Sequence, residues 1–316
     1  MNFECCRTNL PRNFLPVGGR EVIRNRVSVI TTCWNAEKTL ARAITGVRRQ
    51  NYPDIEHIVV DACSSDRSVE LIESPESGVS LWLSANDRGI ADGFNRGLAL
   101  ASGEYIAICN ADDFWGPDHL TVAISCLSDG GDISFGDILR FDEESGEAYR
   151  MVAARRLSVA DTVSWPPEFN HPSMVSRSDV YRRVGGFDPK YKICMDYDWL
   201  IRALKAGFLP IRHDKLTVAM RCGGAADRNL QLMLTEIENI LIENGTRPSI
   251  ASARCRVARL KASVRSSVAE KCGPGVANWL RSKVNASCRP VMEGQQRFIQ
   301  EFLNKDKYLT NHTEWD

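Results

Sequence analysis

Short apolar stretches alternate with helical patterns from residue 26 to about residue 210, and this alternation restricts the fold more than any other feature. Residues 27–31 (V-S-V-I-T), 54–61 and 105–109 are apolar and rich in β-branched side chains, which is typical of buried strands. Between them, segments such as 37–49 place apolar residues three or four positions apart, the spacing of one helix face. Strands that alternate with helices predict an α/β fold, with a mainly parallel sheet covered by helices on both faces.

Further elements follow from the same spacing, and they divide the chain into three parts. Residues 80–83 and 132–141 predict strands, and a turn at 143–146 leads to a partner strand at 148–152. Helices are expected at 65–72, 117–127, 179–184 and 196–206, and again with polar breaks after about residue 225. We therefore expect an N-terminal extension (1–25), an α/β domain (26–224) and a helical, basic C-terminal region (225–316).

Composition limits the class of protein. A chain of 316 residues with 43% hydrophobic and 25% charged residues has ordinary globular composition and room for one large or two smaller domains. No apolar run approaches 18 residues, so no membrane-spanning helix is expected. The first residues contain no apolar leader-like stretch, which favours a cytoplasmic location. Eleven cysteines without a C-x-x-C pair predict reduced thiols rather than a zinc or redox site.

Charge is distributed unevenly although the net charge is zero. From Arg247 onward the chain holds 13 Lys or Arg against six Asp or Glu. Such a basic region attracts nucleic acid or anionic lipid, or it is simply the solvated surface of a helix. It carries no recognisable nucleic-acid motif, so no nucleic-acid partner is expected. Residues 247–260 and 276–284 could form amphipathic helices, and peripheral contact with the inner membrane surface stays open.

Polar side chains gather where the first two strands end. Thr31, Asn35 and Glu37 close the first strand or follow it, and Asp61 closes the second, with Asp66 five residues later. In open α/β sheets the ligand site lies at the carboxyl ends of the strands. Two of these residues have structural alternatives, because Asn35 suits a helix N-cap and Asp66 suits the first turn of a helix. Neither G-x-G-x-x-G nor G-x-x-x-x-G-K-[ST] is present, which argues against dinucleotide and P-loop sites.

A polar loop, a helix and a short strand fill residues 84–113, and the strand is followed by Asn110, Ala111, Asp112 and Asp113. Adjacent carboxylates repel each other, so a site that gathers them usually holds a cation. Hard oxygen ligands in such a place suit Mg²⁺ or Mn²⁺, which in turn suits a diphosphate. A solvated acidic turn is the structural alternative.

In their order along the chain, these motifs resemble the family 2 glycosyltransferases, most of all the bacterial polysaccharide and colanic-acid type. The resemblance rests on T-T-C-W-N-A-E-K-T-L, on V-V-D-A-C-S-S-D-R-S, and on the segment from N-D-R-G to N-A-D-D, all within residues 27–113. A weaker match continues through H-P-S-M and M-D-Y-D-W-L to about residue 224. It implies a GT-A fold with a Rossmann-like sheet, a nucleotide-sugar donor, a divalent metal, inversion at the anomeric carbon, and a glycan or lipid-linked acceptor.

The resemblance also implies roles for individual residues. The expected nucleoside contacts are Thr31, Glu37 and Asp61. Asp87 and Arg88 approach the base or phosphate, and Asp92 and Asn95 face the donor from the following helix. Asn110, Asp112 and Asp113 occupy the D-x-D region, where Asp112 is the expected metal ligand and Asn110 replaces the acidic first residue. Asp113 binds the metal through water or orients the sugar, and His171 lies near the donor phosphates or the acceptor.

Inverting displacement requires a base that takes the proton of the acceptor hydroxyl. The resemblance aligns Asp196, in K-I-C-M-D-Y-D-W-L, with that base, and Met195 stands where the family has Glu. Asp198 is the fallback. Residues two apart on a helix point in different directions, so at most one of the two aspartates faces the acceptor. A helix N-cap is the structural alternative for either.

Two other functions stay open at this stage. A nucleotidyltransferase would need a glycine-rich, basic loop after the first strand, and T-T-C-W-N-A-E-K has no glycine. An impaired paralogue that binds nucleotide-sugar or scaffolds an assembly complex is supported only by Asn110 and Met195. Arg221 and Arg228 flank C-G-G-A-A-D, which is either a loop that closes over a diphosphate or a flexible surface loop.

Overall fold

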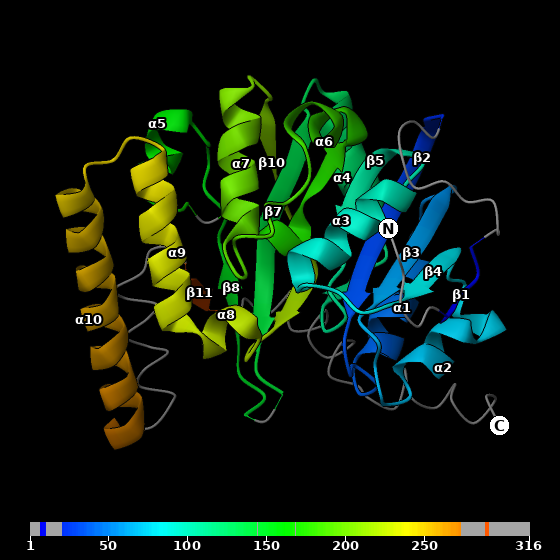
Figure 1. Cartoon of the computed structure of the whole chain (residues 1–316), viewed down its shortest axis with the longest axis horizontal. Coiled ribbons are helices and arrows are strands. Elements are labelled where there is room, and N and C mark those ends of the chain that lie inside the picture. The colour runs from blue at the N-terminus through cyan, green and yellow to red at the C-terminus, as the bar shows by residue number, and fades with distance from the viewer. Residues whose placement is uncertain (1–6, 11–20, 144, 168, 273–287, 291–316) are drawn as a thin grey trace.

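A computed structural model describes residues 7–10, 21–143, 145–167, 169–272 and 288–290 of the chain (Figure 1). Within these ranges, eleven strands form one mixed sheet in the order β1-β4-β3-β2-β5-β9-β7-β10-β6, with β8 beside β7 and β11 beside β8. Helices cover both faces of this sheet. The predicted α/β class is confirmed.

Four parallel strands form the half of the sheet built from the first part of the chain. They are β2 (Ile23–Cys33), β3 (Ile55–Asp61), β4 (Leu81–Ser84) and β5 (Gly103–Ile108), and all four match expected strands. The chain first adds strands on one side of β2, and then β5 pairs with its other side. This reversal places a topological switch point between β2 and β5, at whose carboxyl ends ligands bind in open α/β sheets.

The other half of the sheet is mixed. Strand β7 (Ile133–Phe141) pairs antiparallel with β8 (Ala148–Met151), as expected, and with β9 (Val175–Arg177), which also pairs antiparallel with β5. The long strand β10 (Pro210–Arg221) runs parallel to β7. Three short antiparallel strands complete the sheet: β1 (Arg7–Thr8), β6 (Phe114–Trp115) and β11 (Cys288–Pro290). Neither β9 and β10 nor the three short strands follow from the sequence pattern.

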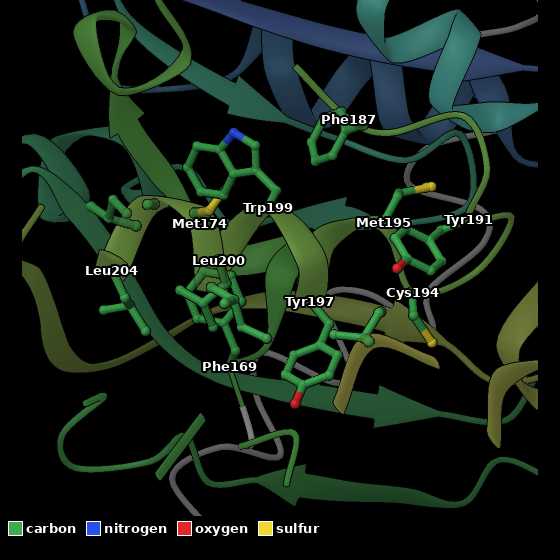
Figure 2. Close-up of a cluster of buried hydrophobic side chains, with 14 of the residues drawn as sticks. Phe169, Met174, Phe187, Tyr191, Cys194, Met195, Tyr197, Trp199, Leu200 and Leu204 are labelled. Atoms are coloured by element: carbon green, nitrogen blue, oxygen red, sulfur yellow. The ribbon is translucent and has the colours of Figure 1, made fainter. Parts of the chain in front are cut away.

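One face of the sheet is covered by α3 (Ile90–Leu100), α6 (Ser178–Val184), α7 (Met195–Lys205) and α9 (Leu230–Glu243). Helix α3 lies so close to β2 that a Cβ on Gly97 would be 2.3 Å from Cγ2 of Ile30, and only glycine fits at this position. Figure 2 shows the centre of this core, where side chains of α7 pack against those of the preceding loop and of the sheet. Its labelled members include Phe169, Met174, Phe187, Met195, Tyr197, Trp199 and Leu200.

The opposite face is covered by α1 (Leu40–Arg48), α2 (Ser68–Glu73) and α4 (His119–Ser128). Short helical segments fill connections between the larger elements. They are η1 (Pro75–Ser77), α5 (Val159–Thr162), η2 (His171–Ser173) and α8 (Ala225–Arg228). The sheet is therefore the middle of three layers.

Helix α9 and the start of α10 (Pro248–Cys272) belong to the same core as α7. Leu234, Ile240, Ala251 and Cys255 are buried there, and α9 and α10 lie side by side in Figure 1. Apart from the short strand β11, the described part of the C-terminal region is thus helical, as expected, but it is not a separate packing unit. No helix in the described ranges has the length and apolar character to cross a bilayer. The expected helix at 276–284 lies outside them.

Candidate active site

The turns that follow β2 and β3 are tied together by hydrogen bonds. Asn35 adopts a left-handed backbone conformation with φ of 50°, and its N–H donates to Oγ of Ser64 over 2.8 Å. The N–H of Glu37 donates to Asp66 over 3.0 Å, while the Glu37 carboxylate accepts from the N–H of Arg67 over 3.2 Å. Asn35 is not the cap of α1, which begins after Thr39. The two turns form one braced rim at the carboxyl end of the sheet.

Asp61 is wholly buried at the end of β3 and joins three strand ends. It lies in register with Cys33 of β2 and Ser84 of β4. Its carboxylate accepts hydrogen bonds from the Ser84 hydroxyl over 2.6 Å, from the Cys33 thiol over 3.4 Å, and from the hydroxyl and backbone N–H of Ser64. Both carboxylate oxygens of Asp61 therefore already accept hydrogen bonds from the protein, and Asp61 stabilises the rim.

Thr31 lies inside the sheet rather than on the rim. It is fully buried, and its Oγ1 is 3.0 Å from Nε2 of His57 on the neighbouring strand. Burial lowers the pKa of His57 to about 3, so the ring is neutral. This placement argues against the predicted contact between the Thr31 side chain and a nucleoside, because the hydroxyl faces the protein core.

The loop between β4 and α3 is braced from the helix. The carboxylate of Asp92 accepts from the backbone N–H of Arg88 over 3.2 Å and is 2.9 Å from the guanidinium of Arg96. Arg96 also donates to the carbonyl oxygen of Asn86 over 2.7 Å, and the carboxylate of Asp87 accepts from the N–H of Gly89 over 2.9 Å. Asp92 therefore faces the loop, contrary to the donor-facing role expected of it. The Arg88 side chain is 80% exposed, and its guanidinium is 3.3 Å from Asp92, so it is open to a ligand.

Asn95 also has a protein partner where a donor contact was expected. Its Nδ2 donates to the carbonyl oxygen of Phe187 over 2.7 Å, and its Oδ1 accepts from the Phe187 N–H over 2.8 Å. These two bonds clamp the turn Gly185-Gly186-Phe187 to α3. Gly186 is required there, since a Cβ would lie 2.2 Å from Oδ1 of Asn95. Asn95 shapes the loop before α7 instead of facing the donor.

Asp112 and Asp113 follow β5 at the switch point. Asp113 is 1% exposed, and its Oδ2 accepts from Nδ2 of Asn110 over 2.6 Å. Burial raises the pKa of both carboxyls, and the charge of Asp112 raises that of Asp113 further. The positive charges of Arg221, Arg42 and Arg228 oppose the rise at Asp112. Asn110 thus orients Asp113, and three arginines stabilise the charged form of Asp112.

Two of these arginines, Arg42 and Arg221, are held by contacts that the sequence did not reveal. Glu143 bridges Arg42 of α1 and Arg221 at the end of β10, at 2.6 Å and 3.0 Å. Arg140 pairs with Asp227 of α8, which also accepts from the N–H of Gly223 over 2.8 Å. The loop after β10 is therefore anchored beside Asp112 through ion pairs. No motif marks Arg42, Arg140 or Glu143, because their roles arise from contacts far apart in sequence.

The donor set fits a divalent cation that is shared with a ligand. No group of three or more His, Cys, Asp or Glu in the described ranges is arranged to hold a metal by itself. The half-buried Asp112 and the buried Asp113 beside it nevertheless offer hard oxygen atoms, and Mg²⁺ is commonly held by one or two carboxylates together with phosphates and water. Asp112, with Asp113 beside it, suits that kind of site.

Asp196 and Asp198 begin α7, and the structure separates their roles. Asp198 is 2.9 Å from Nε of Arg202, which in turn donates to the carbonyl oxygens of Val184 and Gly186 over 2.6 and 2.7 Å. The carboxylate of Asp198 is therefore already paired with Arg202, which holds the turn before α7. Asp196 is partly exposed and accepts from the N–H of Tyr197 over 2.8 Å. Within the described ranges Asp196 forms no ion pair, which leaves its carboxylate the freer of the two.

His171 lies close enough to Asp196 to feel its charge. Burial lowers the pKa of His171, and the negative charge of Asp196 partly offsets that effect. The ring packs edge-on against Phe94 and Phe187, at centroid distances of 6.4 and 5.9 Å. Its Nε2 is buried and has no hydrogen-bond partner among the described residues. His171 thus packs between α3 and the loop before α7, within range of the charge of Asp196.

Comparison with known proteins places this geometry in a family. The model of the family described as Glycosyl transferase family 2 matches residues 28–184. An uncharacterized glycosyltransferase of Mycobacterium tuberculosis is 32% identical over 185 residues, which cover 56% of this chain and 68% of that protein. The chain belongs to glycosyl transferase family 2. A PGL/p-HBAD biosynthesis glycosyltransferase of Mycobacterium bovis is 25% identical over 198 residues, covering 61% of this chain and 75% of that relative.

Solved structures show that this family member has the GT-A fold. A mannosyltransferase from Pyrobaculum calidifontis, in complex with GDP-Man and Mn²⁺, superposes with a TM-score of 0.53 at 19% identity, covering 98% of this chain and 91% of that one. The structure of S. aureus TarS residues 1–349 in complex with UDP-GlcNAc superposes with a TM-score of 0.54 at 16% identity, covering 72% of this chain and 69% of that one. The expected fold is confirmed. Asp196 and α9 lie beyond the residues that the family model matches.

Proposed function

We propose that this glycosyltransferase moves a sugar from a nucleotide-diphosphate sugar to a hydroxyl group of a glycan or lipid-linked acceptor, with inversion at the anomeric carbon, in cell-surface polysaccharide biosynthesis. The observation that carries the proposal is the pair of adjacent carboxylates after β5, the half-buried Asp112 and the buried Asp113, with the charges of Arg42, Arg221 and Arg228 acting on Asp112. Carboxylates and guanidinium groups gathered at a switch point suit a metal-bound diphosphate. The likeness to structures that hold UDP-GlcNAc, or GDP-Man with Mn²⁺, supports the same class of donor.

We propose that the nucleoside lies on the rim formed by the turns after β2 and β3. The exposed residue Glu37 and the exposed Arg88 are the groups that can contact it. The buried carboxylate of Asp61 keeps the rim rigid, so that binding energy is not lost in ordering it. These groups supply positioning of the donor rather than chemistry.

Asp112 would hold Mg²⁺ or Mn²⁺, with Asp113 acting through water or on the sugar. When bound, such an ion stabilises negative charge on a departing diphosphate. Arg42 and Arg221, fixed by Glu143, add positive charge at the same place. Asp113 is kept in orientation by Asn110, which gives the amide at the first D-x-D position a role in place of a lost carboxylate.

Asp196 is the proposed base. It would take the proton of the acceptor hydroxyl as that oxygen attacks the anomeric carbon from the side opposite the diphosphate. The choice between the two aspartates of α7 follows from their partners, since Asp198 is engaged by Arg202 and Asp196 is not. His171, with an unpartnered buried Nε2 near Asp196, borders the acceptor side of the site.

Peripheral contact with the inner membrane surface is part of the proposal for a lipid-linked acceptor. Along α10 the apolar side chains of Val257, Leu260 and Val264 are exposed, and Arg256 and Lys261 lie among them on the same helix. Apolar and basic groups together favour an anionic lipid surface. Sedimentation with anionic but not neutral liposomes is expected, and absence of binding to both would contradict this part.

The experiment that tests the function is a thermal-shift screen of the protein with UDP, GDP, dTDP and CDP, each with and without Mn²⁺. Stabilisation by one nucleotide, enlarged by the metal, is expected, because a ligand that binds only the native state raises its stability. Turnover of the corresponding sugar nucleotide then separates the enzyme from an impaired paralogue. Binding without any turnover across a panel of sugars would contradict the transferase proposal.

A further inference from the structure

A buried carboxylate on α9 holds the loop that leads into α7. Glu236 is 5% exposed, and its two oxygens accept hydrogen bonds from three consecutive backbone N–H groups. The donors are Lys192 at 2.7 Å, Ile193 at 3.0 Å and Cys194 at 2.9 Å. Convergent backbone N–H groups form a site for an anion, and here the protein fills that site with its own carboxylate.

The three N–H donors come directly before α7, the helix that carries Asp196. Cys194 is the residue at which α7 is capped, Met195 is the first residue of the helix, and Asp196 is the second. Fixing three N–H groups directly before the helix fixes the point and direction from which Asp196 emerges. Hydrogen bonds from N–H groups to a carboxylate are charge-assisted and stronger than neutral ones, so the loop is held firmly.

The other end of the same loop is held from the α/β part of the chain. Asn95 clamps Phe187, and Arg202 donates to the carbonyl oxygens of Val184 and Gly186. The loop between α6 and α7 is thus fastened at its beginning by α3 and α7, and at its end by α9. Glu243 of α9 also holds this loop, by accepting from Nζ of Lys190 and from the hydroxyl of Tyr191 over 2.9 Å each, so Glu236 is the anchor of the backbone N–H groups at 192–194.

We propose that Glu236 is a positioning residue for sugar transfer, acting through the loop 192–194 to hold Asp196 at the acceptor. The inference rests on the proposed function, in which Asp196 is the base. It makes α9 a working part of the active site, although this helix lies beyond the residues that define the family match. The donor subsite, built from β2, β3 and β5, does not depend on Glu236.

The kinetic test is Glu236→Gln, with Glu238→Gln as a matched control. Glu238 lies on the same helix but bonds to the hydroxyl of Ser252 on α10, away from the loop. A glutamine at 236 offers only one acceptor oxygen and places an NH₂ group against N–H donors. We expect kcat of Glu236→Gln to fall by about 10²-fold with the donor KM changed by less than about twofold, since small misplacement of a reacting group has effects of this size. Glu238→Gln should keep both constants.

A readout independent of activity separates this inference from the proposed function. Amide hydrogen exchange of residues 192–194 should be slow in the native protein and about tenfold faster or more in Glu236→Gln, with the remaining core unchanged. Unchanged exchange at these amides, or a loss of kcat no larger than in Glu238→Gln, would overturn the positioning role. If the native enzyme shows no transfer at all, the proposed function fails while the exchange result still stands. Should Glu236→Gln not fold, Glu236→Asp, one methylene shorter, is judged by the same two measurements.

Discussion

The contact between Gly186 and Asn95 makes a quantitative prediction about the loop before α7. In Gly186→Ala the new Cβ would lie 2.2 Å from Oδ1 of Asn95, well inside contact distance, so the Asn95 side chain must move. Both ends of that side chain are engaged with the backbone of Phe187, at 2.7 and 2.8 Å. Movement therefore breaks two hydrogen bonds, each contributing about 1 kcal/mol net, and we expect a loss of about 2 kcal/mol in the free energy of unfolding.

The assay is urea denaturation of Gly186→Ala, Asn95→Ala and the double variant, with Gly224→Ala as the control. A Cβ at Gly224 meets nothing within 4 Å, so that change should shift the free energy of unfolding by less than about 1 kcal/mol. Asn95→Ala removes the same two bonds, so the double variant should be no worse than either single one, a departure from additivity of about 2 kcal/mol. Additive losses, or a Gly186→Ala variant as stable as Gly224→Ala, would refute the clamp.

Two further predictions concern pH and metal. Burial lowers the pKa of His57 from an ordinary 6.5 to about 3. On acidification the unfolded chain therefore binds the proton before the folded chain does. The stability that the neutral ring provides is complete above pH 6.5 and is lost as the pH falls towards 3. Between pH 7 and pH 5 this amounts to about 2 kcal/mol, measured as the difference in denaturation between the native protein and His57→Gln, and equal pH slopes for the two would contradict it. Asp112→Ala should abolish the part of nucleotide-induced thermal stabilisation that depends on Mn²⁺, and unchanged Mn²⁺ dependence would remove Asp112 from the metal site.

The sequence predicted the strands around the switch point well because their patterns are local. β2, β3 and β5 are apolar runs that end in polar groups, and nothing in the tertiary structure overrides that signal. β10 was missed because its middle reads R-H-D-K, which suggests a surface loop. The structure places Arg212 of this strand 2.9 Å from Asp137, a wholly buried residue of β7. Because Arg212 pairs with a residue 75 positions away, its charge does not by itself show that residues 210–221 form a strand of the sheet.

For the site, the sequence identified residue types and places better than roles. Asp61, Asp92 and Asn95 were expected to face a donor, yet the polar atoms of each are bonded to protein partners that shape the site. The distinction depends on contacts such as that between Asn95 and Phe187, 92 residues apart, which no local motif encodes. Glu236 gave no sequence signal, because a glutamate in an amphipathic helix is ordinarily solvated.

The central claim is that Asp196 is the base of an inverting sugar transfer, and the rate of transfer by Asp196→Asn, measured beside its donor affinity, tests it most directly. The amide cannot accept the proton, so transfer should fall by about 10³-fold or more, as for loss of a general base. Donor affinity should stay close to that of the native protein, because the proposed donor contacts lie on the β2, β3 and β5 edge. Transfer at a near-native rate, or loss of donor binding in this variant, would contradict the account.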